Sequence, residues 1–440
     1  GAAATVWMSN PFSNPGVATR VVTCSTTSAT RCPTTDGTFT PDVTAQQSVP
    51  GVTPASNVDI LSPNLKQPSI WKANLAFEHE LPWYGLVFGA ELLATQNKNA
   101  IYYQNLNVGA PSATGSDGRA LYYNAAGLNA GCYSFTNNAV SIARECSVVN
   151  KARSNLNYGN VLLAKETDKG DAQLVTLSLT SPTRKGFGWS VAYTHTNATE
   201  VSPLTSSTSN SNWTGRSVFN PNEEVAANSS YLVKDRINAR LSWEKRFFGN
   251  YRTRLGVFYE GRKGKPYSWT INNDLNGDGL AGNDLMYIPS AQGSGEVVFY
   301  GATAAAREDA ERRFWDVVNG NKALRNAKGG VVERNSAFSP WTNSFDVKVT
   351  QEIPGFSDKH KASFSLDILN FGNLLNKKWG RIEEVGFQSA GAQARSFVDY
   401  VGLQDGKYVY AVRNNVEDLN VRQAKGESQW AIQATVKYEF

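Results

Sequence analysis

The last eleven residues of the chain, 430–440, alternate between two faces. One face is apolar throughout and carries Trp430, Ile432, Ala434, Val436, Tyr438 and Phe440. A period of two predicts a β-strand, and this length suits a strand that crosses a lipid bilayer at a tilt. Aromatic rings stand at both ends of the apolar face, and such rings prefer the headgroup level of a membrane. The alternative is an edge strand of a water-soluble β-sandwich, although such edges rarely end on bare aromatic residues.

The sequence contains no segment that predicts a transmembrane helix. Its apolar runs fall short of the roughly eighteen residues that such a helix needs, so the chain can cross a bilayer only as a closed sheet. Hydrophobic residues make up 41% of the 440 residues and aromatic residues 11%, which excludes a disordered chain. The net charge of +5 comes from basic residues scattered among acidic ones, so we expect no nucleic-acid partner.

Short turns and long loops alternate along the chain. The short turns between alternating segments fall at 82–85, 181–186, 248–251 and 354–360, and the long polar loops cover about 97–158, 200–233 and 266–341. Soluble sandwiches keep most connections short, whereas outer-membrane barrels combine short periplasmic turns with long extracellular loops. We therefore expect an all-β fold, namely an antiparallel transmembrane β-barrel, or part of one, with about ten or eleven strands.

Two of these predicted strands, at about 381–387 and 397–403, show weaker alternation than the others. Aromatic residues beside the turns are expected to form a girdle at the periplasmic side of the membrane. They are Trp83, Tyr84, Phe247, Phe248 and Tyr251.

The first 66 residues differ in composition from the rest. They are rich in Ser, Thr, Pro, Gly and Asn and show no sustained period, which predicts an extracellular loop region ahead of barrel strands in 67–440. The chain starts at Gly1 without an initiator Met or a signal peptide. We therefore expect a processed product or a piece of a longer protein.

Four cysteines form two close pairs in the sequence, Cys24 with Cys32 and Cys132 with Cys146. Proximity favours these two disulfides among the three pairings that four cysteines allow, and disulfides indicate an oxidising compartment. The rival interpretation is a zinc site, but neither pair has the C-x-x-C spacing or a histidine nearby.

The loop at 266–341 contains the motif with the clearest ligand chemistry. Asp274, Asn276 and Asp278 stand at alternate positions ahead of a glycine, as in the first half of a calcium-binding loop, and Asp284 follows closely. Leu285 stands where an EF-hand has its bidentate Glu, and the EF-hand helices are not predicted. We expect the side chains of Asp274, Asn276, Asp278 and Asp284 to converge on one Ca²⁺. The alternative is that these residues serve only as turn formers.

Other patterns in the chain give no sign of an enzyme. The run 277–282 matches a dinucleotide fingerprint in form only, since no buried strand precedes it and no helix follows directly. An Ala- and Glu/Arg-rich segment at 302–318 predicts a short helix within the loop. His79, His195 and His360 are far apart, and no nucleophile elbow occurs. We therefore expect no catalytic activity.

An ordered series of motifs between 274 and 379 resembles a known family. The series consists of 274–279 (DLNGDG), 283–289 (NDLMYIP), 334–336 (RNS), 351–354 (QEIP) and 366–376 (LDILNFGNLLN), followed by Trp379. Their order and spacing resemble the barrel end of Oar-like TonB-dependent receptors, over about 67–440. The family has a larger barrel that encloses a plug, and neither a plug nor a TonB box is recognisable here. The resemblance therefore implies the carboxyl-terminal portion of such a receptor.

The resemblance implies energised transport of a bulky ligand across the outer membrane of a bacterium. Implied partners are outer-membrane lipid, the TonB complex acting through a plug outside this chain, and an extracellular ligand that is not identified, with a peptide or protein favoured. The closing strand is similar to those that the barrel-assembly machinery recognises, with Trp430, Tyr438 and Phe440 as the signal. Two alternatives are a passive porin-like barrel and a surface adhesin or secretion-related barrel.

Overall fold

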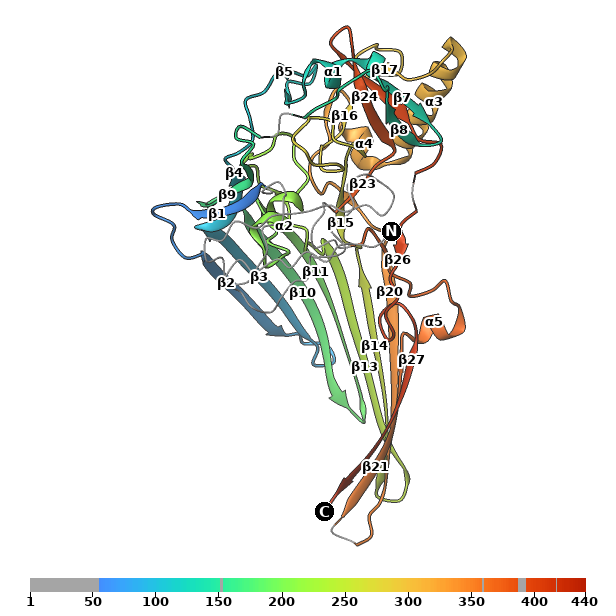
Figure 1. Cartoon of the computed structure of the whole chain (residues 1–440). Coiled ribbons are helices and arrows are strands. Elements are labelled where there is room, and N and C mark those ends of the chain that lie inside the picture. The colour runs from blue at the N-terminus through green and yellow to red at the C-terminus, as the bar shows by residue number, and fades with distance from the viewer. Residues whose placement is uncertain (1–54, 151–152, 358–359, 387–392, 417) are drawn as a thin grey trace, which may run out of the picture.

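The computed structural model describes residues 55–150, 153–357, 360–386, 393–416 and 418–440. It has two parts (Figure 1). The wall is one long antiparallel sheet, and the cap is a layer of folded loops at one end of that sheet. The cap comprises the described residues within 55–68, 99–170, 201–234, 263–341 and 370–430.

Nine long strands form the wall in the order of the sequence, and every neighbouring pair is antiparallel. They are β2 (Ser69–Glu80), β3 (Val87–Lys98), β10 (Asp171–Arg184), β11 (Phe187–Glu200), β13 (Asp235–Phe248), β14 (Tyr251–Arg262), β20 (Thr342–Pro354), β21 (Lys361–Leu369) and β27 (Ala431–Glu439). The short β12 (Ala227–Asn228) pairs with the end of β11 and makes the sheet ten-stranded. The predicted hairpins and the antiparallel fold are confirmed.

The strand register gathers the apolar side chains of the wall on one face. One row of directly opposed residues crosses five strands and consists of Leu241, Val257, Val347, Ile368 and Ile432. Many large side chains of this face remain exposed, such as Leu75 at 71% and Val436 at 73%. A face of this size that nothing covers is suited to lipid rather than water. The sandwich alternative is wrong, because a second sheet would bury these side chains.

The opposite face of the wall is polar and carries ion pairs between neighbouring strands. Arg254 binds Glu244 and Glu352, each with a nitrogen–oxygen distance of 2.7 Å. Lys348 pairs with Asp367 at 2.8 Å. In a transmembrane barrel this face lines the interior.

Of the five aromatic residues predicted for a girdle, four are exposed at the turn end of the wall, and Tyr251 is half-buried. Trp83, Tyr84, Phe247 and Phe248 each show more than half of their surface. They lie beside the turns between β2 and β3 and between β13 and β14, at the end opposite the cap (Figure 1). Exposed rings at this level suit the headgroup region of a membrane.

The two outer strands of the wall, β2 and β27, each pair on one edge only within the described residues. The sheet is therefore open rather than closed into a complete barrel. A barrel removes such edges by joining its first and last strands.

The cap contains all the helices of the described residues and every described strand outside the ten-stranded wall sheet. Its strands are β1 (Ser56–Leu61), β4 (Ala100–Asn105), β5 (Ala113–Thr114), β6 (Ala120–Leu121), β7 (Tyr133–Thr136), β8 (Ala139–Ile142), β9 (Tyr158–Thr167), β15 (Pro266–Trp269), β16 (Tyr287–Ile288), β17 (Val298–Phe299), β18 (Gly330–Val331), β19 (Ala337–Phe338), β22 (Glu383–Glu384), β23 (Ala394–Arg395), β24 (Val398–Gln404), β25 (Lys407–Val412) and β26 (Asn420–Val421). Its helices are α1 (Ala125–Leu128), the 3₁₀ helix η2 (Ala130–Cys132), α2 (Ser209–Thr214), α3 (Ala304–Gly320), α4 (Lys322–Asn326) and α5 (Phe371–Leu375). None of these described helices has the length and apolar character to span a membrane.

The main hydrophobic core of the protein lies in the cap. β24 and β25 pair with each other, and β17 joins β25 in parallel. The predicted helix at 302–318 is confirmed as α3, which begins after Thr303, whose hydroxyl accepts a hydrogen bond from the Ala306 N–H. Phe314 of α3 is fully buried and contacts the rings of Phe299 and Phe397.

The segments at 381–387 and 397–403, predicted as wall strands, belong to the cap instead. The first contains only β22 among its described residues, and the second forms most of β24. The residues from Val398 to Gly402 are buried on both faces of β24, so this strand lacks the lipid-facing side of a wall strand.

Candidate functional site

The predicted calcium loop is a closed turn of the cap between β15 and β16. Thr270 and Leu285 form a bridge at its base, and the Ile271 N–H donates to the Asp284 carbonyl at 2.9 Å. The side chains of Ile271, Leu275 and Met286 are buried and anchor the loop in the core. The sequence folds tightly here because glycines take the left-handed conformations that the turns require, as at Gly279 with φ of 91°.

The side chains of Asp274 and Asn276 accept hydrogen bonds from the backbone of the loop. The Asp274 carboxylate accepts from the N–H groups of Gly277 at 2.6 Å and Gly279 at 2.9 Å. The Asn276 side-chain oxygen accepts from the Asp278 N–H at 2.7 Å. These bonds turn both side chains toward the inside of the loop.

Asp284 lies at the end of the loop and forms an ion pair with an arginine from a distant part of the chain. One carboxylate oxygen accepts from the Leu275 N–H at 2.8 Å, and the other lies 3.2 Å from the guanidinium of Arg119. Arg119 also pairs with Asp117 at 3.3 Å, so one positive charge serves two carboxylates. The side chains of Arg119 and Asp284 have no solvent exposure. Sequence reasoning missed Arg119, since a lone arginine 165 residues away carries no local signal.

Asp278 and Asn283 are buried side by side, with exposures of 3% and 2%. One Asp278 oxygen lies 3.4 Å from the amide nitrogens of both Asn276 and Asn283, which is long for a hydrogen bond. The side-chain oxygen of Asn283 has no hydrogen-bond partner. Asn283 was absent from the predicted ligand set, although it stands next to Asp284 in the sequence.

Burial raises the pKa of each carboxyl in the loop. The pKa of Asp274 rises to about 7, through burial and then through the nearby Asp284 carboxylate. The pKa of Asp278 lies well above its usual range for the same reasons, with Asp274 adding to the effect. The pKa of Asp284 is also raised, because burial outweighs the attraction of Arg119. All three shifts disfavour the charged carboxylates, so these groups bind protons more readily than exposed aspartates do.

The structure brings the four predicted ligands into one buried loop. Hydrogen bonds connect Asn276 with Asp278 and the loop backbone with Asp284. Within the described residues, however, no group of three or more His, Cys, Asp or Glu side chains stands ready to hold a metal ion. Convergence of all four side chains on one Ca²⁺ therefore stays a prediction, and any cation here would need amide oxygens beside carboxylates.

The predicted disulfide between Cys132 and Cys146 is present and lies in the same cap. The segment just before this disulfide contacts the candidate site, because the Tyr123 hydroxyl donates to the Asp274 carbonyl at 2.6 Å. The Tyr122 N–H donates to the Asn276 carbonyl at 2.7 Å. Two segments far apart in sequence therefore meet at the candidate site. Cys24 and Cys32 lie outside the described residues.

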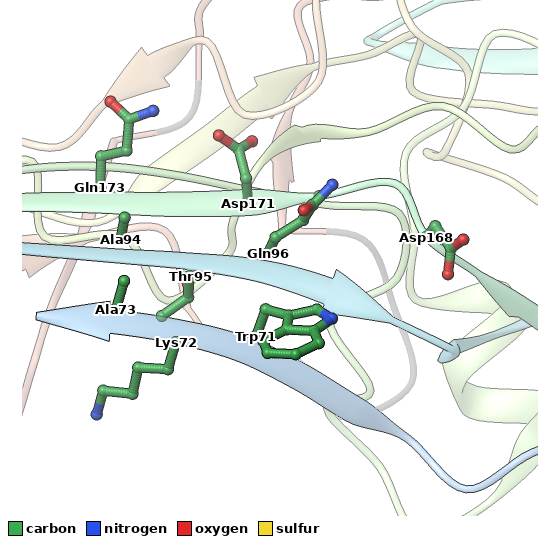
Figure 2. A pocket seen from close by; sticks show the side chains of 10 residues that line it. Trp71, Lys72, Ala73, Ala94, Thr95, Gln96, Asp168, Asp171 and Gln173 are labelled. Atoms are coloured by element: carbon green, nitrogen blue, oxygen red, sulfur yellow. The ribbon is translucent and has the colours of Figure 1, made fainter.

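A second candidate region is a shallow hollow of about 520 Å³ on the wall near its open edge (Figure 2). Trp71, Gln96 and Asp171 oppose one another across β2, β3 and β10 at the cap end of these strands. Asp171 also accepts a hydrogen bond from the Thr199 hydroxyl at 2.7 Å. A tryptophan beside polar groups marks the level where a lipid-facing surface meets water. None of the predicted site residues lines this hollow.

The proposed assembly signal lies on the closing strand. Trp430 precedes β27 at its cap end, and Phe440 follows it at the turn end. Phe440 is 96% exposed. The Tyr438 hydroxyl contacts the backbone N–H of Phe356 at 3.1 Å, so it ties the last strand to the preceding turn. Recognition of these residues by assembly machinery stays a prediction.

Comparison with known proteins identifies one family. The family model described as the outer membrane beta barrel domain matches residues 4–378. The matched range includes the wall from β2 to β21 and the whole candidate calcium loop. No curated protein matches the chain.

Proposed function

The chain belongs to the outer membrane beta barrel family, and from this premise we propose that it is the barrel part of a TonB-dependent receptor. In this proposal the receptor moves a bulky ligand across the bacterial outer membrane. The family match indicates the bacterial outer membrane as the location. The TonB-dependent mode of action is the proposal, and it rests on the cap.

The observation that carries this proposal is that the extracellular loops form a folded body. The cap has its own aromatic core, a disulfide and helix α3, all at one end of the wall (Figure 1). Loops held rigidly by a scaffold are suited to recognition. A passive pore needs an open mouth rather than a packed layer, so the cap supports a receptor.

The open edges of the wall support a larger assembly. β2 and β27 each leave one row of backbone donors and acceptors without a strand partner in the described residues. Such rows are costly in a membrane, where no water can satisfy them. We propose that further strands outside the described residues pair with these edges and enclose a plug.

A hollow lies between α4 and the cap ends of β13 and β14, and its lining favours a polar ligand. Its volume is about 760 Å³, and its lining includes Lys234, Lys263 and Lys322 together with Asp235 and Glu333. A site with both charge signs can bind charged side chains of a peptide. The proposed ligand class is therefore a peptide or protein, as the family resemblance implies.

The test uses the protein purified from the source outer membrane and intact source cells. Intact mass spectrometry should show a chain that includes a plug, and planar bilayers should show no steady ion conductance. Cells should take up a fluorescent casein digest only with the receptor gene present and the proton gradient intact. Steady conductance would instead establish a porin. Binding of the digest at the cell surface without uptake would establish an adhesin.

A further inference from the structure

We propose that the cap loop 274–284 binds one Ca²⁺, with Asp278 and Asn283 as central ligands and Asp274 and Asn276 completing the site. Asp284 instead pairs with Arg119 and shapes the loop. The proposed role of the ion is to fasten this loop to the cysteine-bearing loop of the cap. The inference does not depend on the transport function.

The charge balance of the loop favours a bound cation. The Arg119 guanidinium pairs with Asp117 and Asp284, and the carboxylates of Asp274 and Asp278 lie near that of Asp284. Asp278 and Asp284 are buried. Buried carboxylates without enough positive charge are costly, and they require either protons or a metal ion. A divalent ion would balance most of this charge while keeping the carboxylates as ligands.

The unpartnered oxygen of Asn283 points independently to a ligand. Its residue is 2% exposed, and its amide nitrogen faces the Asp278 carboxylate at 3.4 Å. The oxygen of the same amide belongs to the same cluster and accepts no hydrogen bond. A buried polar atom without a partner is uncommon and costs stability. Rotation of the Asn283 amide by 180° would turn this oxygen toward the Asp278 carboxylate, where one cation could bind both oxygens.

The chemistry of the donors favours Ca²⁺ over other ions. Every candidate ligand atom is a carboxylate, amide or backbone oxygen, and Ca²⁺ prefers such hard oxygen donors in irregular geometry. Thiolates and imidazoles, which select transition metals, are absent from the loop sequence. Mg²⁺ usually keeps several waters and is bound by fewer protein groups.

The position of the site gives the ion a mechanical role. The Tyr122 N–H and the Tyr123 hydroxyl both donate to backbone carbonyls of the loop. The Asn150 side chain reaches the Asp274 carboxylate at 3.5 Å. An ion that holds the loop in shape therefore also holds these three contacts, which join the loop to the segment around the disulfide.

The test measures terbium luminescence of the full-length protein in detergent, since Tb³⁺ replaces Ca²⁺ and neighbouring tyrosines such as Tyr123 sensitise it. Asp278→Asn and Asn283→Ala should each weaken binding by at least about tenfold, because even supporting groups of metal sites contribute that much. Asp316→Asn is the matched control, since Asp316 is an exposed acidic residue of α3 in the same cap. Its affinity should equal that of the wild type.

A second readout is protease cleavage of the cap in calcium and in EGTA. Cleavage of the wild type should be faster in EGTA, and Asn283→Ala should remove most of this difference. The Asn283→Ala variant keeps the measurement informative if Asp278→Asn fails to fold, since the removed oxygen has no partner in the fold. Equal Tb³⁺ affinity in wild type and Asn283→Ala, or cleavage that is independent of calcium, would overturn the proposal.

Discussion

The wall and the cap solve the same problem, the burial of apolar side chains, in opposite ways. Wall side chains such as Leu75 and Val436 stay more than 70% exposed, whereas cap side chains such as Phe314 and Tyr400 have no exposure. The wall therefore depends on lipid to cover its apolar face, and the cap supplies its own core. The comparison shows that this membrane protein combines a lipid-facing sheet with a cap that has a buried hydrophobic core, as soluble domains do.

The largest expected effect follows from opening the cap core. Phe314→Ala should destabilise the cap by about 3–5 kcal/mol, since large aromatic side chains in full contact leave a cavity when truncated. Protease cleavage of the cap in outer-membrane vesicles would measure the loss. The wall should keep its heat-resistant form on gels. Simultaneous loss of both parts would show that they are one cooperative unit.

The next effect tests whether lipid covers the wall. Leu177→Arg should destabilise the membrane-inserted protein by about 2–4 kcal/mol, the cost of a charge on the lipid face near the bilayer centre. Thr176→Arg on the opposite face is the matched control, and it should have a much smaller effect. Unfolding by urea in lipid vesicles would measure both. Equal costs for the two variants would contradict a lipid-facing side.

The disulfide of the cap should contribute a comparable amount. The double variant Cys132→Ser with Cys146→Ser should lower cap stability by about 3 kcal/mol, because the bond closes a short loop and restricts the unfolded chain. Thermal unfolding with and without reductant would measure the change. The reductant should have no effect on the double variant, apart from any contribution of Cys24 and Cys32.

The smallest effect is expected for a pair on the polar face of the wall. Lys348→Ala should change stability by less than about 1 kcal/mol, since its side chain is 56% exposed and water screens its pair with Asp367. Urea unfolding in vesicles is again the measurement. A loss comparable to that of Leu177→Arg would mean that the two faces of the wall are not as different as the burial indicates.

The two parts also differ in how far the sequence predicts them. The wall follows from alternation, because a period of two and short turns determine both strand pairing and the lipid-facing side. Cap strands such as β24 are buried on both faces, so they lack alternation, and the sequence placed that segment in the wrong part of the molecule. The pairing of Asp284 with Arg119 depends on long-range packing, which is why Arg119 escaped the sequence pattern. Asn283 lies within the motif itself, but its burial beside Asp278 is visible only in the structure.

The order of the wall strands has a consequence for biogenesis. Each wall strand pairs with the wall strand before it in the chain, so the wall can form by adding neighbouring strands one at a time. The cap cannot form in this order, because its contacts join segments far apart in the chain. β17 pairs with β25, and the Asn273 side chain accepts a hydrogen bond from the Tyr400 N–H. The cap segments that form the core must therefore all be on the same side of the membrane before the core can close.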